Sequence, residues 1–195
     1  MRWLPVLSLI AACARPLPPP PADMVRTVAV LPPANRTGDP LLVAGTSFLE
    51  KYALKSDRVT VPDVLASEAR LQLARRGFTV VSADDVERAT EGRAPGSPAA
   101  AAEIAFRAKL TGLALFLDVR RWEPDAPTHP TFVLVGLTAS LVDPATGRVV
   151  WSAERRMSPV PTPGEVALGP AYVTAARKVV DEVLAPLGPE RPPAS

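Results

Sequence analysis

The chain has 195 residues, of which 47% are hydrophobic and 22% are charged, as in globular proteins that bury a core. The 22 basic residues are balanced by 20 acidic ones, and a net charge of +2 excludes the strongly basic footprint of a nucleic-acid-binding protein. With one Cys and one His, the sequence excludes an internal disulfide, a multi-cysteine metal site and a histidine-rich metal cluster.

The first predicted element is a lipoprotein signal peptide, residues 1–12. Its apolar run is about ten residues long, which is half of what a membrane-spanning helix needs and typical of a leader. The segment Ile10-Ala11-Ala12-Cys13 resembles the bacterial lipobox, in which the Cys sulfur receives diacylglycerol, the leader is cut before it, and the new amine is acylated. We therefore expect a covalent diacylglycerol and N-acyl lipid at Cys13 and no other cofactor. The alternative is an ordinary leader that is removed together with the Cys.

The residues after Cys13 give the expected location and spacing. Ala14 stands where an Asp retains Gram-negative lipoproteins at the inner membrane, so by that resemblance the chain belongs to the outer membrane, on its periplasmic face. Residues 13–24 form a linker in which Arg15–Pro21 contains five prolines, and it is expected to be a polyproline II spacer. Residues 188–195 are expected to be a flexible tail.

Between these ends, residues 25–187 predict a single α/β domain with a mixed β-sheet of about five strands and helices packed on it. Apolar runs and the alternation of buried and exposed positions predict strands at Thr27–Pro33, Phe78–Ser82, Leu113–Val119, Thr131–Asp143 and Arg148–Arg156. Capping residues and helical periodicity predict helices at Leu41–Leu54, Thr60–Gly77, a short segment from Asp84 or Asp85, Ser97–Gly112 and Ala171–Leu187. The last helix carries one apolar stripe, composed of Tyr172, Ala176, Val179, Val180, Val183, Leu184 and Leu187.

Three segments together resemble a group of bacterial envelope lipoproteins with the fold of the TolB amino-terminal domain, a group that includes CsgG and LpoB. The segments read VAVLPPANRTGD, RRGFTVVSADDV and LVDPATGRVVWSAERR. The resemblance implies a TolB amino-terminal-like fold and a membrane-tethered periplasmic adaptor or assembly subunit that is often a homo-oligomer. The resemblance implies no shared chemistry that could be assigned to this chain.

Two candidate sites for partners follow from the order of the elements. If the last three strands form an antiparallel meander, one end of the sheet gathers a candidate partner surface made of Arg120, Arg121, Trp122, Arg155 and Arg156. Arg and Trp are favoured anchors of interfaces, so this surface suits a protein or an anionic polymer. The alternative is a solvated rim that is neutralised by Asp118, Glu123, Asp125 and Glu154.

The second candidate is the loop after the first strand, with Asn35, Arg36, Thr37 and Asp39 as binding residues. Binding residues of open α/β sheets often follow strands in this way. The alternative is a rigid turn that places the next helix. For catalysis, the one His, His129, lies in a Pro-flanked loop and is expected to be solvated, so we expect no enzyme and no metal site.

Taken together, the sequence predicts an outer-membrane-anchored periplasmic lipoprotein that is not an enzyme. It would act as an assembly, regulatory or secretion-accessory module through contacts with an envelope protein. The alternative is a binder of an anionic envelope polymer, either peptidoglycan or an exported polysaccharide.

Overall fold

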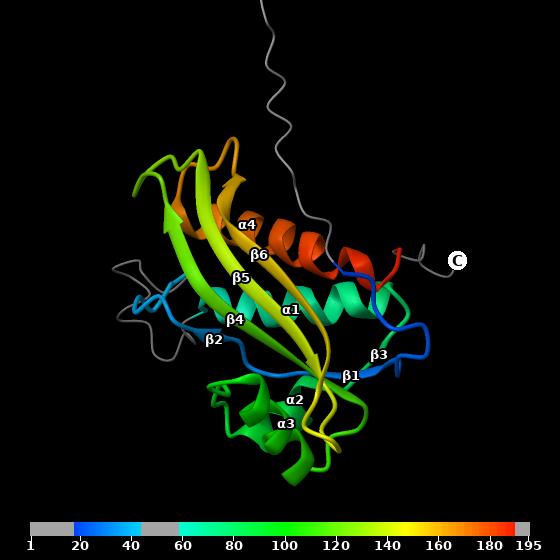
Figure 1. The fold of residues 1–195 in the computed structure, drawn as a ribbon. Helices are drawn as coiled ribbons and strands as arrows, with labels where there is room; N and C mark the ends of the chain where they lie inside the picture. Colours follow the sequence, from blue (N-terminus) through cyan, green and yellow to red (C-terminus); the bar gives the residue numbers. More distant parts are fainter. Residues whose placement is uncertain (1–17, 44–58, 190–195) are drawn as a thin grey trace, which may run out of the picture.

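The computed structural model describes residues 18–43 and 59–189, and its centre is a mixed β-sheet of six strands in the order β3-β1-β4-β5-β6, with β2 paired to β4 beside this path (Figure 1). The strands are β1 Thr27–Val30, β2 Ala34–Asn35, β3 Thr79–Val80, β4 Leu113–Pro124, β5 Phe132–Val142 and β6 Val149–Pro161. The helices are α1 Val61–Arg75, α2 Ala83–Thr90, α3 Pro98–Arg107 and α4 Leu168–Leu184, which continues into a 3₁₀ turn at Ala185–Leu187.

The sheet is parallel on one side and antiparallel on the other. β1 runs parallel to both β3 and β4, whereas β4, β5 and β6 form the antiparallel meander that the sequence predicts. β1 ends at Val30, earlier than the predicted Pro33, because the two following prolines have no N–H for a ladder. A short further strand, β2, then pairs with β4 through Ala34 and Asn35. The α/β class and the mixed sheet are therefore confirmed.

Helices cover the two faces of the sheet unequally (Figure 1). α1 and α4 pack on one face, where the larger core gathers Leu65, Leu115, Leu141 and Val180, all fully buried. α2 and α3 pack on the opposite face at one end of the sheet, over a smaller core that includes Phe116. Where the long strands β4, β5 and β6 extend past α2 and α3, that second face carries charged side chains.

Local signals place the helices as predicted. Thr60 and Asp63 form a complete capping box at the start of α1, with the Asp63 carboxylate 2.8 Å from the Thr60 amide nitrogen. Ser97 caps α3 by accepting a hydrogen bond from Ala100 N at 3.1 Å. All seven residues of the apolar stripe on the last helix are buried, which confirms its orientation.

The helix predicted at Leu41–Leu54 is wrong at its start. Leu41 has a φ of 50°, outside the right-handed helical region, and Leu42 forms an isolated antiparallel bridge with Thr60. The backbone here turns back toward α1 instead of coiling. The rest of that prediction lies in residues 44–58, outside the described residues, as do the signal peptide, Cys13 and residues 190–195 of the tail.

The proline-rich linker differs from the expected spacer in its described part. The indole N–H of Trp151 on β6 donates to the Pro18 carbonyl oxygen at 2.9 Å, and Met24 packs against the larger core. From Pro18 onward the linker therefore lies along the domain (Figure 1). Residues 13–17 of the predicted spacer lie outside the described residues.

Within residues 18–43 and 59–189, no helix combines the length and the hydropathy needed to cross a bilayer.

Candidate functional site

The strongest candidate site is the charged part of the second sheet face, which we call the open face. It consists of Asp118, Arg120, Arg121 and Glu123 on β4, Thr138 on β5, and Glu154 and Arg156 on β6. Side chains on this face alternate with core residues along each strand. α2 and α3 cover the same face only over Phe116 and its neighbours in the smaller core.

A β-bulge in β4 creates the arginine-rich part of the open face. The register between β4 and β5 shifts between Val119 and Arg121, so two successive residues, Arg120 and Arg121, are exposed. The next residue, Trp122, consequently turns to the opposite face and is buried. Because Arg121 pairs with Gly136 and Arg155 pairs with Leu137 across β5, both arginine pairs lie at the same level of the sheet, as predicted.

The predicted surface is nevertheless wrong in two of its five members. Trp122 has 2% of its surface exposed and makes an edge-to-face contact with Tyr172 at 6.1 Å between ring centroids. Arg155 has 8% exposed and faces α4. Both belong to the helix-covered side of the sheet, so they are structural residues and cannot contact a partner at the open face.

Arg155 is tied to its surroundings by several hydrogen bonds. Its guanidinium donates to the Val135 carbonyl oxygen at 2.7 Å and to the Ser158 carbonyl oxygen at 2.9 Å. It also forms an ion pair with Glu182 of α4 at 2.9 Å. The side chain thus fastens β6 to both β5 and α4.

On the open face itself, acidic side chains pair with most of the arginines. Arg120 contacts Asp118 at 3.3 Å and Glu154 at 3.7 Å, and Arg121 contacts Glu123 at 2.8 Å. These side chains are about half exposed apart from Asp118, so the pairs are solvated and contribute little to stability. This arrangement matches the alternative of a neutralised rim for these two arginines.

Asp125 of the predicted neutralising set and Arg156 of the predicted partner surface do not take part in these ion pairs. Asp125 leaves the face and holds the loop between β4 and β5, where the Thr131 hydroxyl donates to it and lowers the pKa of the Asp125 carboxyl. Arg156 is exposed and forms no ion pair with any of the described residues. Arg156 is therefore the cation of the open face that is available to an anionic group.

The loop of the second candidate site is joined to the open face, a connection that the sequence did not indicate. Arg36 donates from Nε to the Asp118 carboxylate at 2.8 Å and also donates to the Gly96 carbonyl oxygen. Asp118 therefore lies between Arg36 and Arg120. The two residues of the Arg36–Asp118 pair are 82 positions apart in the chain, so no local pattern could have revealed it.

The other residues of this loop bind one another. The Asn35 side chain accepts from Thr37 N at 3.0 Å and donates to the Asp39 carbonyl oxygen at 2.7 Å, while Asp39 accepts from Leu41 N at 2.8 Å. The pKa of the Tyr172 hydroxyl is raised mainly because Tyr172 is buried, and the negative charge of Asp39 raises it further. Asn35, Thr37 and Asp39 thus build a rigid turn, in agreement with the alternative reading of the loop.

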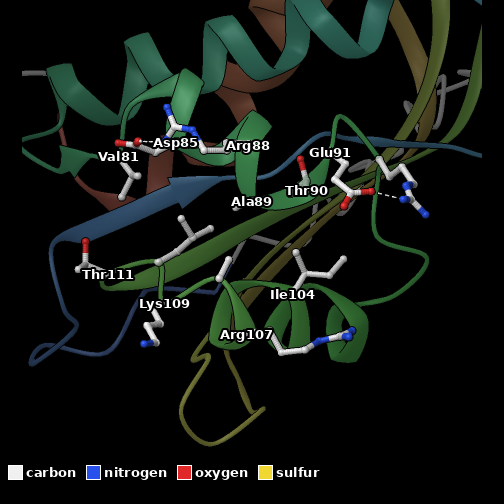
Figure 2. Close-up of a pocket in the computed structure, with 13 residues that line it drawn as sticks. Val81, Asp85, Arg88, Ala89, Thr90, Glu91, Ile104, Arg107, Lys109 and Thr111 are labelled. Carbon is white, nitrogen blue, oxygen red and sulfur yellow. Dashed lines mark hydrogen bonds and ion pairs between the residues drawn. The ribbon is translucent and has the colours of Figure 1, made fainter.

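A hollow lies between α2 and α3, with a volume of about 790 Å³. Figure 2 shows the apolar Val81 and Ile104 directed into it, with Arg107 and Lys109 at its margin. Arg88 pairs with Asp85 at 2.8 Å, and Arg93 pairs with Glu91. Hydrogen bonds from Ser82 and Arg88 lower the pKa of the Asp85 carboxyl. The paired charges around an apolar floor are typical of a solvated surface between helices.

Neither this hollow nor the open face presents a recognisable catalytic arrangement. His129 is an exposed loop residue with a φ of 52°, and its backbone N–H approaches the Val166 carbonyl oxygen at 3.4 Å. Residues 18–43 and 59–189 contain no group of three His, Cys, Asp or Glu side chains placed to hold a metal ion. What the open face offers chemically is recognition by guanidinium and carboxylate groups.

Comparison with known proteins identifies the fold. No family model and no curated protein sequence matches the chain. Among solved structures, the PelC dodecamer from Paraburkholderia phytofirmans is 21% identical, with a TM-score of 0.52 over 90% of this chain and 97% of that one. The lipoprotein GNA1162 from Neisseria meningitidis is 19% identical, with a TM-score of 0.48 over 66% and 79%. The LpoB C-terminal domain from Salmonella enterica is 17% identical, with a TM-score of 0.44 over 72% and 87%.

The match to PelC extends over almost the whole of both chains, so the two proteins share a fold. The resemblance to envelope lipoproteins seen in the sequence is therefore confirmed for the fold.

Proposed function

We propose that the chain is a lipid-anchored subunit of the bacterial cell envelope that assembles with copies of itself and acts through protein contacts instead of catalysis. The observation that carries the proposal is the fold shared with the PelC dodecamer over nearly the full length of both chains. The lipobox-like segment ending at Cys13 supports the anchor.

The charges of the open face favour a protein partner over an anionic polymer. Arg36, Arg120 and Arg121 each face a carboxylate, so a polymer would have to compete with these ion pairs for every guanidinium. A protein surface that carries both acidic and basic side chains can replace each of these ion pairs with a new pair across the interface. Arg156 then supplies the unpaired cation.

The location proposed for the anchor is the periplasmic face of the outer membrane, since Ala14 follows Cys13 in place of Asp. Expression of the full chain in a Gram-negative host, followed by separation of the inner and outer membranes on a density gradient, tests this location. The matched control is Cys13→Ala. The proposal expects the native chain in the outer-membrane fraction after a high-salt wash and the variant released from it.

Light scattering on the detergent-solubilised native chain tests the assembly. We expect a protein mass that is a multiple of the subunit mass and that persists on dilution into the micromolar range. A monomer at that concentration, or a Cys13→Ala variant that stays bound to membranes after salt, would overturn the corresponding part of the proposal.

A further inference from the structure

The linker contacts the domain only a few residues after Cys13, whereas a free spacer would reach the domain only at its end, near residue 24. Trp151 holds the Pro18 carbonyl oxygen at 2.9 Å, and Pro18 is five residues after Cys13. A fully extended chain spans at most about 3.6 Å per residue, so Cys13 lies within about 18 Å of Pro18. An anchor at Cys13 therefore brings the bilayer close to this part of the domain.

The domain surface beside this attachment is apolar. The linker crosses one end of the sheet, and a groove of about 760 Å³ lies there, lined by Pro21, Met24, Phe106, Pro144 and Val150 among others. Val25 and Phe106 line this groove, and Val149 is next to Val150, which also lines it; we call these three residues, Val25, Phe106 and Val149, the linker-end patch. Its side chains are 53%, 62% and 48% exposed, although all three are large and hydrophobic.

The patch lies within reach of the anchor. Trp151 pairs with Leu141 and Val149 pairs with Val142, so the irregularity at Val150 places Val149 one ladder position from Trp151, about 3.4 Å along the sheet, on the face that α3 covers. Val150, between them, lines the same groove as Phe106 and Val25. Met157, also exposed at 60%, is six residues beyond Trp151 in the other direction, about 20 Å toward the far end of β6.

The charged residues around the patch balance one another. Lys109 and Arg148 are exposed at this end of the sheet, and neither forms an ion pair with any of the described residues. Asp143 on the β5–β6 turn accepts a hydrogen bond from the Thr146 hydroxyl at 2.7 Å and stays negatively charged. Asp23 on the linker is also exposed, so the two carboxylates offset the two cations and apolar contact is the main attraction.

We infer that the linker-end patch faces and contacts the bilayer that holds the anchor, so that Phe106 and Val149 reach the lipid while the far end of β6 points into the periplasm. This inference rests on the proposed lipid at Cys13. The occupant is the membrane, because an anchor confined within about 18 Å of Pro18 keeps the lipid surface beside this end of the sheet.

The single Cys makes the test clean, since a lipidated Cys13 sulfur is a thioether and cannot react with thiol reagents. Three variants, Phe106→Cys, Val149→Cys and the matched control Met157→Cys, would be purified from membranes, labelled with a nitrobenzoxadiazole fluorophore and reconstituted. The vesicles would contain phosphatidylethanolamine, phosphatidylglycerol and a spin-labelled lipid quencher. Because all three side chains are about half exposed or more, each variant is expected to fold, and circular dichroism checks this.

We expect quenching by the spin-labelled lipid to be at least twice as strong at positions 106 and 149 as at position 157. Equal quenching at all three positions, or stronger quenching at 157, in a sample whose mass shows the lipid on Cys13, overturns the inference and leaves the proposed function intact. A sample whose mass shows no lipid on Cys13 overturns the proposed anchor first, and the inference with it.

Discussion

Arg155 and Arg156 are adjacent in sequence but are placed on opposite faces of β6, which allows a direct test of the structure. We predict that Arg155→Met lowers the free energy of unfolding by about 3 kcal/mol. The substitution keeps the aliphatic stem but leaves the carbonyl oxygens of Val135 and Ser158 without their donor. Each such unsatisfied group costs about 1–3 kcal/mol.

The ion pair with Glu182 adds little to this figure. The Glu182 side chain is 55% exposed, so its carboxylate is solvated again once the guanidinium is removed. The matched control is Arg156→Met, whose side chain is exposed and for which we expect a change within about 0.5 kcal/mol.

Urea denaturation followed by tryptophan fluorescence measures both variants. With a slope of about 2 kcal/mol per molar urea, the midpoint of Arg155→Met should fall by about 1.5 M while that of Arg156→Met stays in place. Equal midpoint shifts for the two variants would show that β6 does not present Arg155 to the core, and the assignment of the open face would fail with it.

Three further predictions concern the linker, a close backbone approach and the loops. Trp151→Phe removes the donor to Pro18, so limited proteolysis should cut the linker several times faster, whereas unchanged cleavage would argue against the docked linker. Gly112→Ala should lower the free energy of unfolding by more than about 3 kcal/mol in chemical denaturation, because the new Cβ would lie 2.2 Å from the Thr27 backbone oxygen. The control Gly147→Ala, whose Cβ would meet nothing within 4 Å, should lower it by about 1–2 kcal/mol. The Thr131 hydroxyl lowers the pKa of Asp125, so the Asp125 carboxylate stabilises the loop above its unfolded pKa near 4, and this contribution disappears as the pH falls through the lower folded value. Asp125→Asn should therefore lose less stability than the native chain as the pH is lowered below about 4, measured as urea midpoints in an acid titration.

Much of the architecture could be predicted because its signals are local. Thr60 and Asp63 mark the start of α1 within four residues, and the stripe from Tyr172 to Leu187 fixes which side of α4 is buried. In the strand predicted at Arg148–Arg156, the buried Trp151 and Ala153 alternate with the exposed Ser152 and Glu154. These features depend on hydrogen bonds and periodicities within one element, so the sequence contains them in full.

The candidate site could be predicted only in part, since its geometry depends on non-local features. The bulge at Arg120 exposes two successive arginines and buries Trp122. The residue pattern of β4 does not indicate this shift of register. The ion pair of Arg36 with Asp118 joins a loop to a strand far along the chain. A one-residue difference in register likewise separates a buried Arg155 from an exposed Arg156.

The most direct test of the proposed role is the intact mass of the mature chain isolated from envelope membranes. We predict a chain that begins at Cys13 and carries the added mass of a diacylglycerol and an N-linked acyl group. An unmodified amino terminus at any residue after Cys13 would contradict the anchor and, with it, the proposed place of this protein in the envelope.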